Sequence, residues 1–299
     1  MSRVITAYAH YKQSGEKIAG PNGYGIGADN LLRSARRLQA LHQQAGALGV
    51  GVTIVSGGGN FLRKTDFING YTGSEPLPAE LLDEIDTTAR WGTVDNARAI
   101  GGALNAIGVP ATVLLAPGME QFDSRWGKSL PNTVENRMEV MAAGRVGVIG
   151  GGTGGNKCTT DAAVAQITQE QAIFNLQAAD GDPDAAAKAY AFKATQVNNV
   201  YNRDPHQPGE GELIAYDVVS AAEMLASPGD YGVSPEDLLR HPEKMGVVDT
   251  LTVEILAAAP EGAPVSLNVY NGDRYSPVEA LAAMQSGNHI GTLIVPNFA

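Results

Sequence analysis

The sequence predicts an α/β fold, a three-layer αβα sandwich in which a mainly parallel central sheet lies between two layers of helices. Short apolar segments bounded by glycine, such as Val52–Val55 and Val146–Ile149, are typical of strands buried on both faces. They alternate with longer segments of helical periodicity, which indicates parallel strands joined by helices. The 299 residues, 43% of them hydrophobic, suffice for one large domain or two closely joined lobes.

Apolar runs and helical spacing predict the elements in order. The strands are expected at Arg3–Tyr11, Val52–Val55, Ala111–Ala116, Val146–Ile149, Phe192–Val197, Val265–Val269 and Thr292–Val295. The helices are expected at Ala28–Leu48, Leu81–Asn105, Val134–Ala143, Thr159–Leu176, Asp249–Ala258 and Ser276–Gln285. Lys64–Pro78 and Ala179–Asp184 are expected to be loops, and any division into lobes is expected near Gln177–Tyr190, where the composition turns polar.

Charge and composition exclude several functional classes. The formal net charge of −11 opposes binding to duplex DNA or anionic membranes, so we expect neither as a partner. The only cysteine is Cys158, which rules out an intrachain disulfide and suits a reducing cytoplasm. The first ten residues lack the pattern of a signal peptide, and no apolar run approaches the ~20 residues of a membrane span. We therefore expect a cytoplasmic protein that acts on small molecules.

Four turns rich in glycine or asparagine each follow a predicted strand. They lie at Ser14–Gly15, Gly57–Gly59, Gly150–Gly155 and Asn198–Asn199. In a parallel α/β sheet, such turns gather at the carboxyl ends of the strands, where ligands bind. Glycine lets backbone N–H groups approach phosphate oxygens closely. The four turns therefore predict a phosphate site, although the chain has neither a P-loop motif nor a dinucleotide-binding glycine motif after a strand.

Charged residues border these turns. Lys12 precedes the first turn, Arg63 follows the second, and Asp161 follows the third. Phosphoryl transfer requires cations that offset the charge of the transferred group and a carboxylate that orients a lysine or a metal, so these three are candidate catalytic residues. The acidic segment Asp180–Asp184 lacks the remainder of an EF-hand loop, and no dedicated metal site is expected.

Longer motifs occur in order along the chain: YKQSGE at Tyr11–Glu16, GPNGYGIG at Gly20–Gly27, SGGGNFLR at Ser56–Arg63, GGTGGNKCTTD at Gly151–Asp161, FKATQVNNVYNRDP at Phe192–Pro205, VVD at Val247–Asp249 and GTLI at Gly291–Ile294. They resemble the corresponding motifs of bacterial UMP kinases of the amino acid kinase superfamily. The resemblance runs from the first strand to the last. It implies the amino acid kinase fold in one domain, 1–299, with an acceptor-binding lobe over about 1–176 and a nucleotide-binding lobe over about 190–299.

The resemblance also implies roles on the donor side. Lys12 is expected to bridge the transferred group, with Asp161 orienting it, and Arg63 to sit at the junction of donor and acceptor. The residues expected to bind ATP are Lys12, Gln13, Ser14, Gly15, Gly59, Arg63, Thr195, Tyr201 and Asp204. ATP is the implied donor and Mg²⁺ the implied ion.

On the acceptor side, Gly58 is expected to hold the acceptor phosphate and Asp86 the ribose. The remaining expected acceptor residues are Thr153, Gly154, Gly155, Asn156, Lys157, Cys158, Thr159 and Thr160. The segment that resembles the one tied to GTP regulation comprises Gly20, Pro21, Asn22, Gly23, Tyr24 and Gly25. The resemblance further implies a homohexamer.

The sequence departs from the family most sharply at Asn156–Cys158, where UMP kinases have P-F-F. Lys157 adds a cation next to a helix N-terminus that already favours anions, which predicts an acceptor with an extra anionic or strongly polar group. The leading function is phosphorylation of UMP to UDP. One alternative is a kinase of this fold that acts on another phosphate, phosphonate or carboxylate acceptor. Another is a non-enzymatic nucleotide-binding protein or a molybdate or tungstate store of the same fold.

Overall fold

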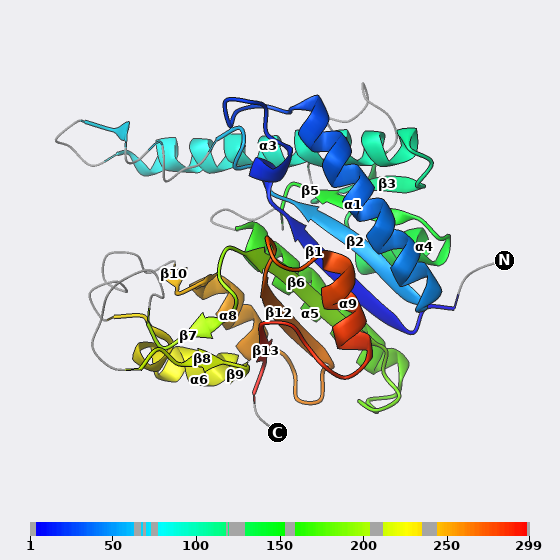
Figure 1. The fold of residues 1–299 in the computed structure, drawn as a ribbon, viewed down its shortest axis with the longest axis vertical. Helices are drawn as coiled ribbons and strands as arrows, with labels where there is room; N and C mark the ends of the chain where they lie inside the picture. The colour runs from blue at the N-terminus through cyan, green and yellow to red at the C-terminus, as the bar shows by residue number, and fades with distance from the viewer. Residues whose placement is uncertain are drawn as a thin grey trace. The chain divides into compact units, whose positions relative to one another are not determined.

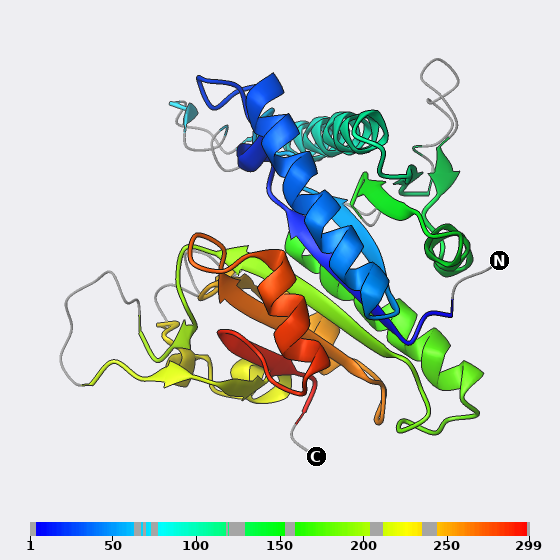
Figure 2. The same cartoon turned by 45° about the vertical axis from the view of Figure 1, so that its right-hand side comes forward.

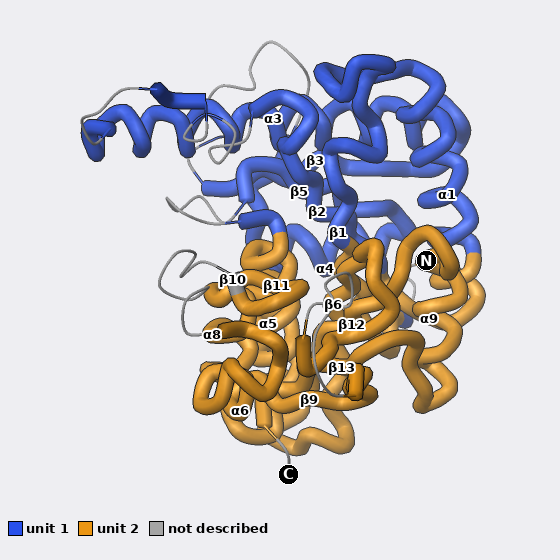
Figure 3. Tube along the Cα trace, turned by 60° about the vertical axis from the view of Figure 1, so that its left-hand side comes forward, with its two compact units in different colours: residues 1–4, 12–43, 52–160 blue, residues 5–11, 44–51, 161–299 orange. Residues whose placement is uncertain are grey.

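The computed structural model describes residues 4–62, 67, 70–72, 77–117, 119, 129–152, 159–203, 212–234 and 244–297. The chain divides into two compact units, drawn in different colours in Figure 3. Unit 1 comprises residues 1–4, 12–43 and 52–160, and unit 2 comprises residues 5–11, 44–51 and 161–299. Most of the predicted loop Lys64–Pro78 lies outside the described residues.

Unit 1 contains a parallel sheet in the order β4-β3-β5-β2. Its strands are β2 (Val50–Ser56), β3 (Ala111–Leu115), β4 (Leu130–Pro131) and β5 (Val146–Gly150). Its helices are the 3-10 helix η1 (Gly15–Ile18), α1 (Ala28–Ala47), α3 (Ala79–Ala106) and α4 (Val134–Ala142). Helix α1 runs alongside β2 (Figure 2), while α3 packs against β3 and β5.

Unit 2 contains a sheet in the order β1-β6-β12-β13-β9, in which only the β12–β13 pair is antiparallel. Its strands are β1 (Ala7–Gln13), β6 (Lys188–Thr195), β9 (Val218–Ser220), β12 (Val265–Asn271) and β13 (Thr292–Val295). The helices are α5 (Thr160–Ala178), α6 (Ala221–Ala226), η3 (Pro228–Tyr231), α8 (Thr250–Ala257) and α9 (Pro277–Gln285). Helices α5 and α9 cover opposite faces of β6 (Figure 1). Two small antiparallel ribbons pair β7 (Val200–Tyr201) with β8 (Ala215–Tyr216), and β10 (Lys244–Met245) with β11 (Val248–Asp249).

Side-chain caps and buried aromatic rings fix these elements locally. Helix α9 begins with a capping box in which the Ser276 and Glu279 side chains bond each other's backbone N–H groups. Tyr11 at the end of β1 stacks on Phe192 of β6, with ring centroids 4.3 Å apart. Burial, with a contribution from Tyr270, raises the pKa of the Tyr11 phenol well above its ordinary value, so this ring stays neutral inside the core. Among the described helices, none combines the length and hydropathy that crossing a membrane requires.

The predicted fold class is confirmed, since both units consist of mainly parallel strands flanked by helices. The strand expected at Phe192–Val197 instead begins at Lys188 and ends at Thr195. It ends there because the Thr195 hydroxyl donates to Val197 O at 2.7 Å and accepts from Val197 N at 3.2 Å, which closes a turn. The two-residue strands were not predicted, because so short a pairing leaves no periodic pattern.

Gly291 in unit 2 provides a test of this packing. Its φ is +83°, and a Cβ at this position would lie 2.6 Å from Asn198 O and 3.0 Å from Tyr270 Cα. We expect Gly291→Ala to lower the free energy of unfolding by at least about 3 kcal/mol, because left-handed strain adds to a clash with backbone. The control is Gly287→Ala. Gly287 has a φ of +77°, but an added Cβ would have no atom within 4 Å, so this variant should lower the free energy of unfolding by only about 1 kcal/mol. Equal midpoints of urea unfolding for the two variants would contradict the close packing of Gly291 against the backbone of Asn198 and Tyr270.

Candidate active site

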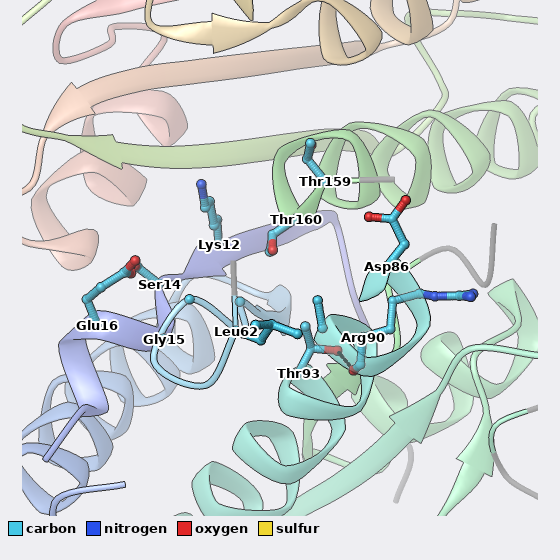
Figure 4. Close-up of a pocket in the computed structure, with 14 residues that line it drawn as sticks. Lys12, Ser14, Gly15, Glu16, Leu62, Asp86, Arg90, Thr93, Thr159 and Thr160 are labelled. Atoms are coloured by element: carbon cyan, nitrogen blue, oxygen red, sulfur yellow. Dashed lines mark hydrogen bonds between the residues drawn. The ribbon is translucent and has the colours of Figure 1, made fainter. Parts of the chain in front are cut away.

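A pocket of about 410 Å³ lies within unit 1 (Figure 4). This volume falls in the range of small-molecule sites. Three parts of unit 1 build it: the glycine turns after β1 and β2, one face of α3, and Thr159 and Thr160, the last residues of unit 1, where α5 begins. The lining residues are Lys12, Ser14, Gly15, Glu16, Gly57, Gly58, Gly59, Leu62, Asp86, Ala89, Arg90, Thr93, Thr159 and Thr160.

The glycine turns after β1 and β2 approach each other more closely than any side chain would permit. A Cβ at Gly15 would lie 2.9 Å from Gly57 O and 3.0 Å from Gly59 N. Gly57 N–H donates to Gln13 O at 2.8 Å, which joins the end of β1 to the second turn. Because Gly15, Gly58 and Gly59 line the pocket without side chains, an anion can approach their backbone closely, whereas the Gly57 amide is already bonded.

Two buried asparagines clamp the second turn. Asn60 and Asn96 exchange side-chain hydrogen bonds, with Asn60 donating at 3.0 Å and Asn96 donating at 2.5 Å. The second amide hydrogen of Asn96 bonds Gly57 O at 2.7 Å, and that of Asn60 bonds Gly25 O at 2.7 Å. All four amide hydrogens are therefore used inside the core, which fixes the orientation of both side chains and of the turn.

Helix α3 is pressed against both glycine-rich segments. A Cβ at Gly58 would lie 2.9 Å from Ala89 O and 3.2 Å from Thr93 N. The Thr93 hydroxyl donates to Arg90 O and accepts from Gly151 N, both at 2.7 Å. Helix α3 thus connects the turn after β2 with the start of the glycine-rich segment after β5.

One face of α3 supplies the wall of the pocket. Asp86, Ala89, Arg90 and Thr93 are spaced three and four residues apart, so they share one side of the helix. Only Asp86 among them was predicted. The signal that would have found the others is this helical spacing from Asp86. Glu16 and Leu62 were missed as well; the Ser14 hydroxyl donates to the Glu16 carboxylate.

Several predicted residues come together in this pocket. They are Lys12, Ser14, Gly15, Gly58, Gly59, Asp86, Thr159 and Thr160. In Figure 4, Lys12 and Asp86 lie on either side of Thr160. Gln13 contributes its carbonyl to the turn rather than lining the pocket. A positive side chain beside bare amides favours an anion at the Lys12 end, and a carboxylate favours hydroxyl groups at the Asp86 end.

The predicted residues of unit 2 lie in separate surroundings. Asp161, in the first turn of α5, forms a buried ion pair with Lys193 of β6, whose side chain is 11% exposed. Lys193 was not predicted, although it stands in the FKAT motif. Thr195 closes the turn after β6, and Tyr201 belongs to the β7–β8 ribbon. The expectation that Asp161 orients Lys12 remains a prediction.

The remaining predicted residues lie outside the described residues: Arg63, Thr153, Gly154, Gly155, Asn156, Lys157, Cys158 and Asp204. In the described part of the chain, no three or more His, Cys, Asp or Glu side chains are grouped to hold a metal ion. The expected regulatory segment is described, and it folds into a tight loop in which Gly20 N–H donates to Tyr24 O at 3.2 Å.

Sequence comparison relates the chain to known enzymes. The model of the amino acid kinase family matches residues 24–236. The chain is 30% identical over 214 residues to a uridylate kinase of Cereibacter sphaeroides, a match that covers 72% of this chain and 73% of the relative. It is 32% identical over 194 residues to a uridylate kinase of a Bradyrhizobium species, covering 65% and 68%.

Comparison of structures gives the same fold. The UMP kinase of Bacillus anthracis matches with a TM-score of 0.64 at 19% identity, covering 98% of each chain. The UMP kinase of Ureaplasma parvum matches with a TM-score of 0.63 at 16% identity, again covering 98% of each chain. At these identities the likeness establishes the fold alone.

The asparagine clamp yields a prediction that needs no ligand. We expect Asn96→Ala to accelerate amide hydrogen exchange in the peptide that contains Gly57–Asn60, because Gly57 O and Asn60 lose their buried partners. Asn105→Ala is the control: Asn105 lies on the same helix and bonds the backbone of Ala111, away from the pocket. If both variants leave exchange at the turn unchanged, the clamp does not hold it.

Proposed function

Because the chain belongs to the amino acid kinase family and is a phosphotransferase, we propose that it transfers the γ-phosphoryl group of ATP to UMP, yielding UDP and ADP. The observation that supports this proposal most strongly is the pocket of unit 1. It combines the glycine turn Gly57–Gly59, the side chain of Lys12, and the Asp86 carboxylate on helix α3. An anion-binding end and a hydroxyl-binding end in one pocket suit a nucleoside monophosphate.

The acceptor phosphate binds at the turn Gly57–Gly59, where the backbone amides of Gly58 and Gly59 donate to its oxygens, while the Gly57 amide stays bonded to Gln13 O. The ribose then lies along α3, where the Asp86 carboxylate accepts hydrogen bonds from its hydroxyls. Arg63 offsets the charge that accumulates between donor and acceptor. Residues 153–158, together with Thr159 and Thr160, complete the acceptor site.

The donor phosphates bind at the turn Ser14–Gly15, with Lys12 bridging the transferred group. Gln13 and Gly59 add backbone contacts, and Thr195, Tyr201 and Asp204 bind the base and ribose of ATP. An oxygen of the acceptor phosphate attacks the γ-phosphorus as the bond to the β–γ bridging oxygen breaks, so ADP leaves with that electron pair. The acceptor oxygen is already deprotonated near pH 7, and catalysis therefore depends on positioning and charge.

Mg²⁺ is proposed to enter with ATP. Glu16, which lines the pocket beside the turn Ser14–Gly15, would supply a carboxylate oxygen, since Mg²⁺ typically takes one or two carboxylates besides phosphates. When bound, the ion adds positive charge beside the phosphates. Asp161, which forms an ion pair with Lys193, is proposed to orient Lys12.

The segment Gly20–Gly25 is proposed as a regulatory site that responds to GTP. A physical connection supports this: Gly25 N–H donates to Asn60 O at 2.8 Å, and Gly25 O accepts from the Asn60 side chain. Tyr24 meets the Phe61 ring edge-on, with centroids 6.0 Å apart. A shift in this loop would therefore act on the residues that hold the phosphate turn.

An ADP-release assay across UMP, CMP, dTMP and simple phosphonates tests the proposed acceptor. UMP should give the highest kcat/KM. Release of ADP with a phosphonate but not with UMP would reject UMP and leave a kinase with a different acceptor.

Lys12 provides a direct catalytic test. We expect Lys12→Ala to keep its fold and to lose about 100-fold or more in kcat, because one cation that contacts the transferred group is removed. Lys17→Ala is the matched control, since Lys17 lies in the following 3-10 helix η1, is exposed and does not line the pocket. Near-native kcat in Lys12→Ala would show that Lys12 is not the bridging cation.

We also propose a homohexamer, the assembly that the motif resemblance implies. Light scattering at micromolar concentration should report a mass several times the 31.2 kDa of one chain. A monomer mass under these conditions would reject the assembly.

A further inference from the structure

Helix α1 of unit 1 exposes a positively charged face. Arg33, Arg36 and Arg37 are all exposed and form what we call the cationic face, beside Leu32, which is 39% exposed. The only acid of this helix is Asp29, one turn before Arg33. Among the residues that the structure describes, none forms an ion pair with the three arginines. Because residues three and four apart are neighbours on a helix, these like charges repel one another in the isolated chain.

The first turns of α3, also in unit 1, expose a negatively charged face. Glu80, Asp83 and Glu84 are all exposed and form what we call the acidic face, beside Leu81, which is 40% exposed. Helix α3 carries no Lys or Arg before Arg90. Within the described ranges, the three carboxylates have no ion pair either. Acids near a helix N-terminus interact favourably with the helix dipole, but they repel one another at this spacing.

The same part of α3 packs against very little. Of residues 79–91, only Ile85 is buried. Figure 1 shows these first turns of α3, drawn in cyan, extending beyond the strands of unit 1. A helix in water derives most of its stability from packing one face against other elements. The acidic face therefore belongs to a helical segment that a partner would stabilise.

The two faces match each other in charge and in length. Each carries three like charges at positions i, i+3 and i+4, so each extends about 6 Å along its helix. An exposed leucine lies beside each triplet: Leu32 on α1 and Leu81 on α3. Three arginines of one helix can therefore face three carboxylates of the other while the two leucines exclude water beside them.

We propose that the cationic face of α1 docks on the acidic face of α3 in a second copy of this chain. The contact joins two different surfaces, so it forms twice about a two-fold axis or repeats around a ring. The argument does not depend on the phosphorylation of UMP, and it gives the proposed assembly a specific contact.

The energy of this contact comes from several charge pairs acting together. One ion pair on an exposed surface contributes little, because water and salt screen it. Pairs within an interface are screened less, and like charges brought face to face there are strongly unfavourable. Association should consequently weaken as NaCl is raised from about 0.05 M to about 0.5 M.

Charge reversal tests the contact, with the mass of the native protein and of each variant measured by sedimentation velocity at micromolar concentration. The α1 reversal carries Arg33→Glu, Arg36→Glu and Arg37→Glu. The α3 reversal carries Glu80→Lys, Asp83→Lys and Glu84→Lys. Either reversal alone makes the two faces alike in charge, so association should weaken about 100-fold or more.

Mixing the two reversal variants gives the sharpest result. The glutamates on α1 of one variant then oppose the lysines on α3 of the other, and the native arginines oppose the native acids. The equimolar mixture should recover the native mass, and a chain that carries both reversals should assemble by itself. The control variant reverses three exposed acids of unit 2 and should keep the native mass; it carries Asp184→Lys, Glu254→Lys and Glu261→Lys.

Amide hydrogen exchange gives a second readout, since the α1 reversal leaves the sequence of α3 unchanged. If α1 of one copy covers α3 of the next, the amides of residues 79–91 should exchange faster in the α1 reversal than in the native protein. Equal exchange rates would contradict the contact.

The outcomes separate this contact from the other proposals. A native mass in either reversal variant, or no recovery on mixing, overturns the contact while the assembly itself stands. A monomeric native protein overturns the contact and the assembly but leaves the phosphoryl transfer untouched. Should a reversal variant not fold by circular dichroism, neutral replacements at the same positions (Arg→Gln, Glu→Gln and Asp→Asn) should weaken association about tenfold, and unchanged association there equally rejects the contact.

Discussion

The candidate site depends on the close approach of two glycine turns. Gly15 meets the backbone of Gly57 and Gly59 at distances that exclude any Cβ, and Gly58 meets α3 in the same way. The turn after β2 is consequently held between the backbone of Gly15 and the backbone of α3. Such an arrangement is costly in conformational entropy, because glycine loses more freedom on folding than any other residue. The buried pair Asn60 and Asn96 offsets part of this cost by bonding the turn at fixed points.

Helix α3, which contacts the glycine turn at Gly58, extends the binding surface beyond that turn. Its residue Thr93 joins the phosphate turn to Gly151, and the preceding turns of the helix place Arg90 and Asp86 along one wall of the pocket. The rise of the helix sets the distance from the glycine turn to each of these side chains. The spacing of polar groups on a ligand must therefore match these distances. From the glycine turn outward, the helix presents Thr93, then Arg90, then Asp86, so a ligand whose phosphate lies at the turn would reach the Asp86 carboxylate with its hydroxyl groups.

The sequence predicts the elements that depend on local pattern. Buried strands appear as apolar runs between glycines, and the glycine turns mark the ends of these strands, so the Lys12 and Gly58 ends of the site were predictable. Arg90 was not, because its place in the pocket follows from tertiary packing of α3 on Gly58 rather than from a motif. Lys193 was missed because its partner Asp161 lies on another element, 32 residues away along the chain. The exchanged bonds of Asn60 and Asn96 likewise link distant segments that no local pattern connects.

The most direct test of the central claim is an experimental structure of the protein with UMP and a non-hydrolysable ATP analogue. The account predicts the UMP phosphate on the amides of Gly58 and Gly59 and the ribose hydroxyls on Asp86, both in the pocket of unit 1. UMP bound elsewhere on the chain, or bound in this pocket with its base at the glycine turn, would contradict it.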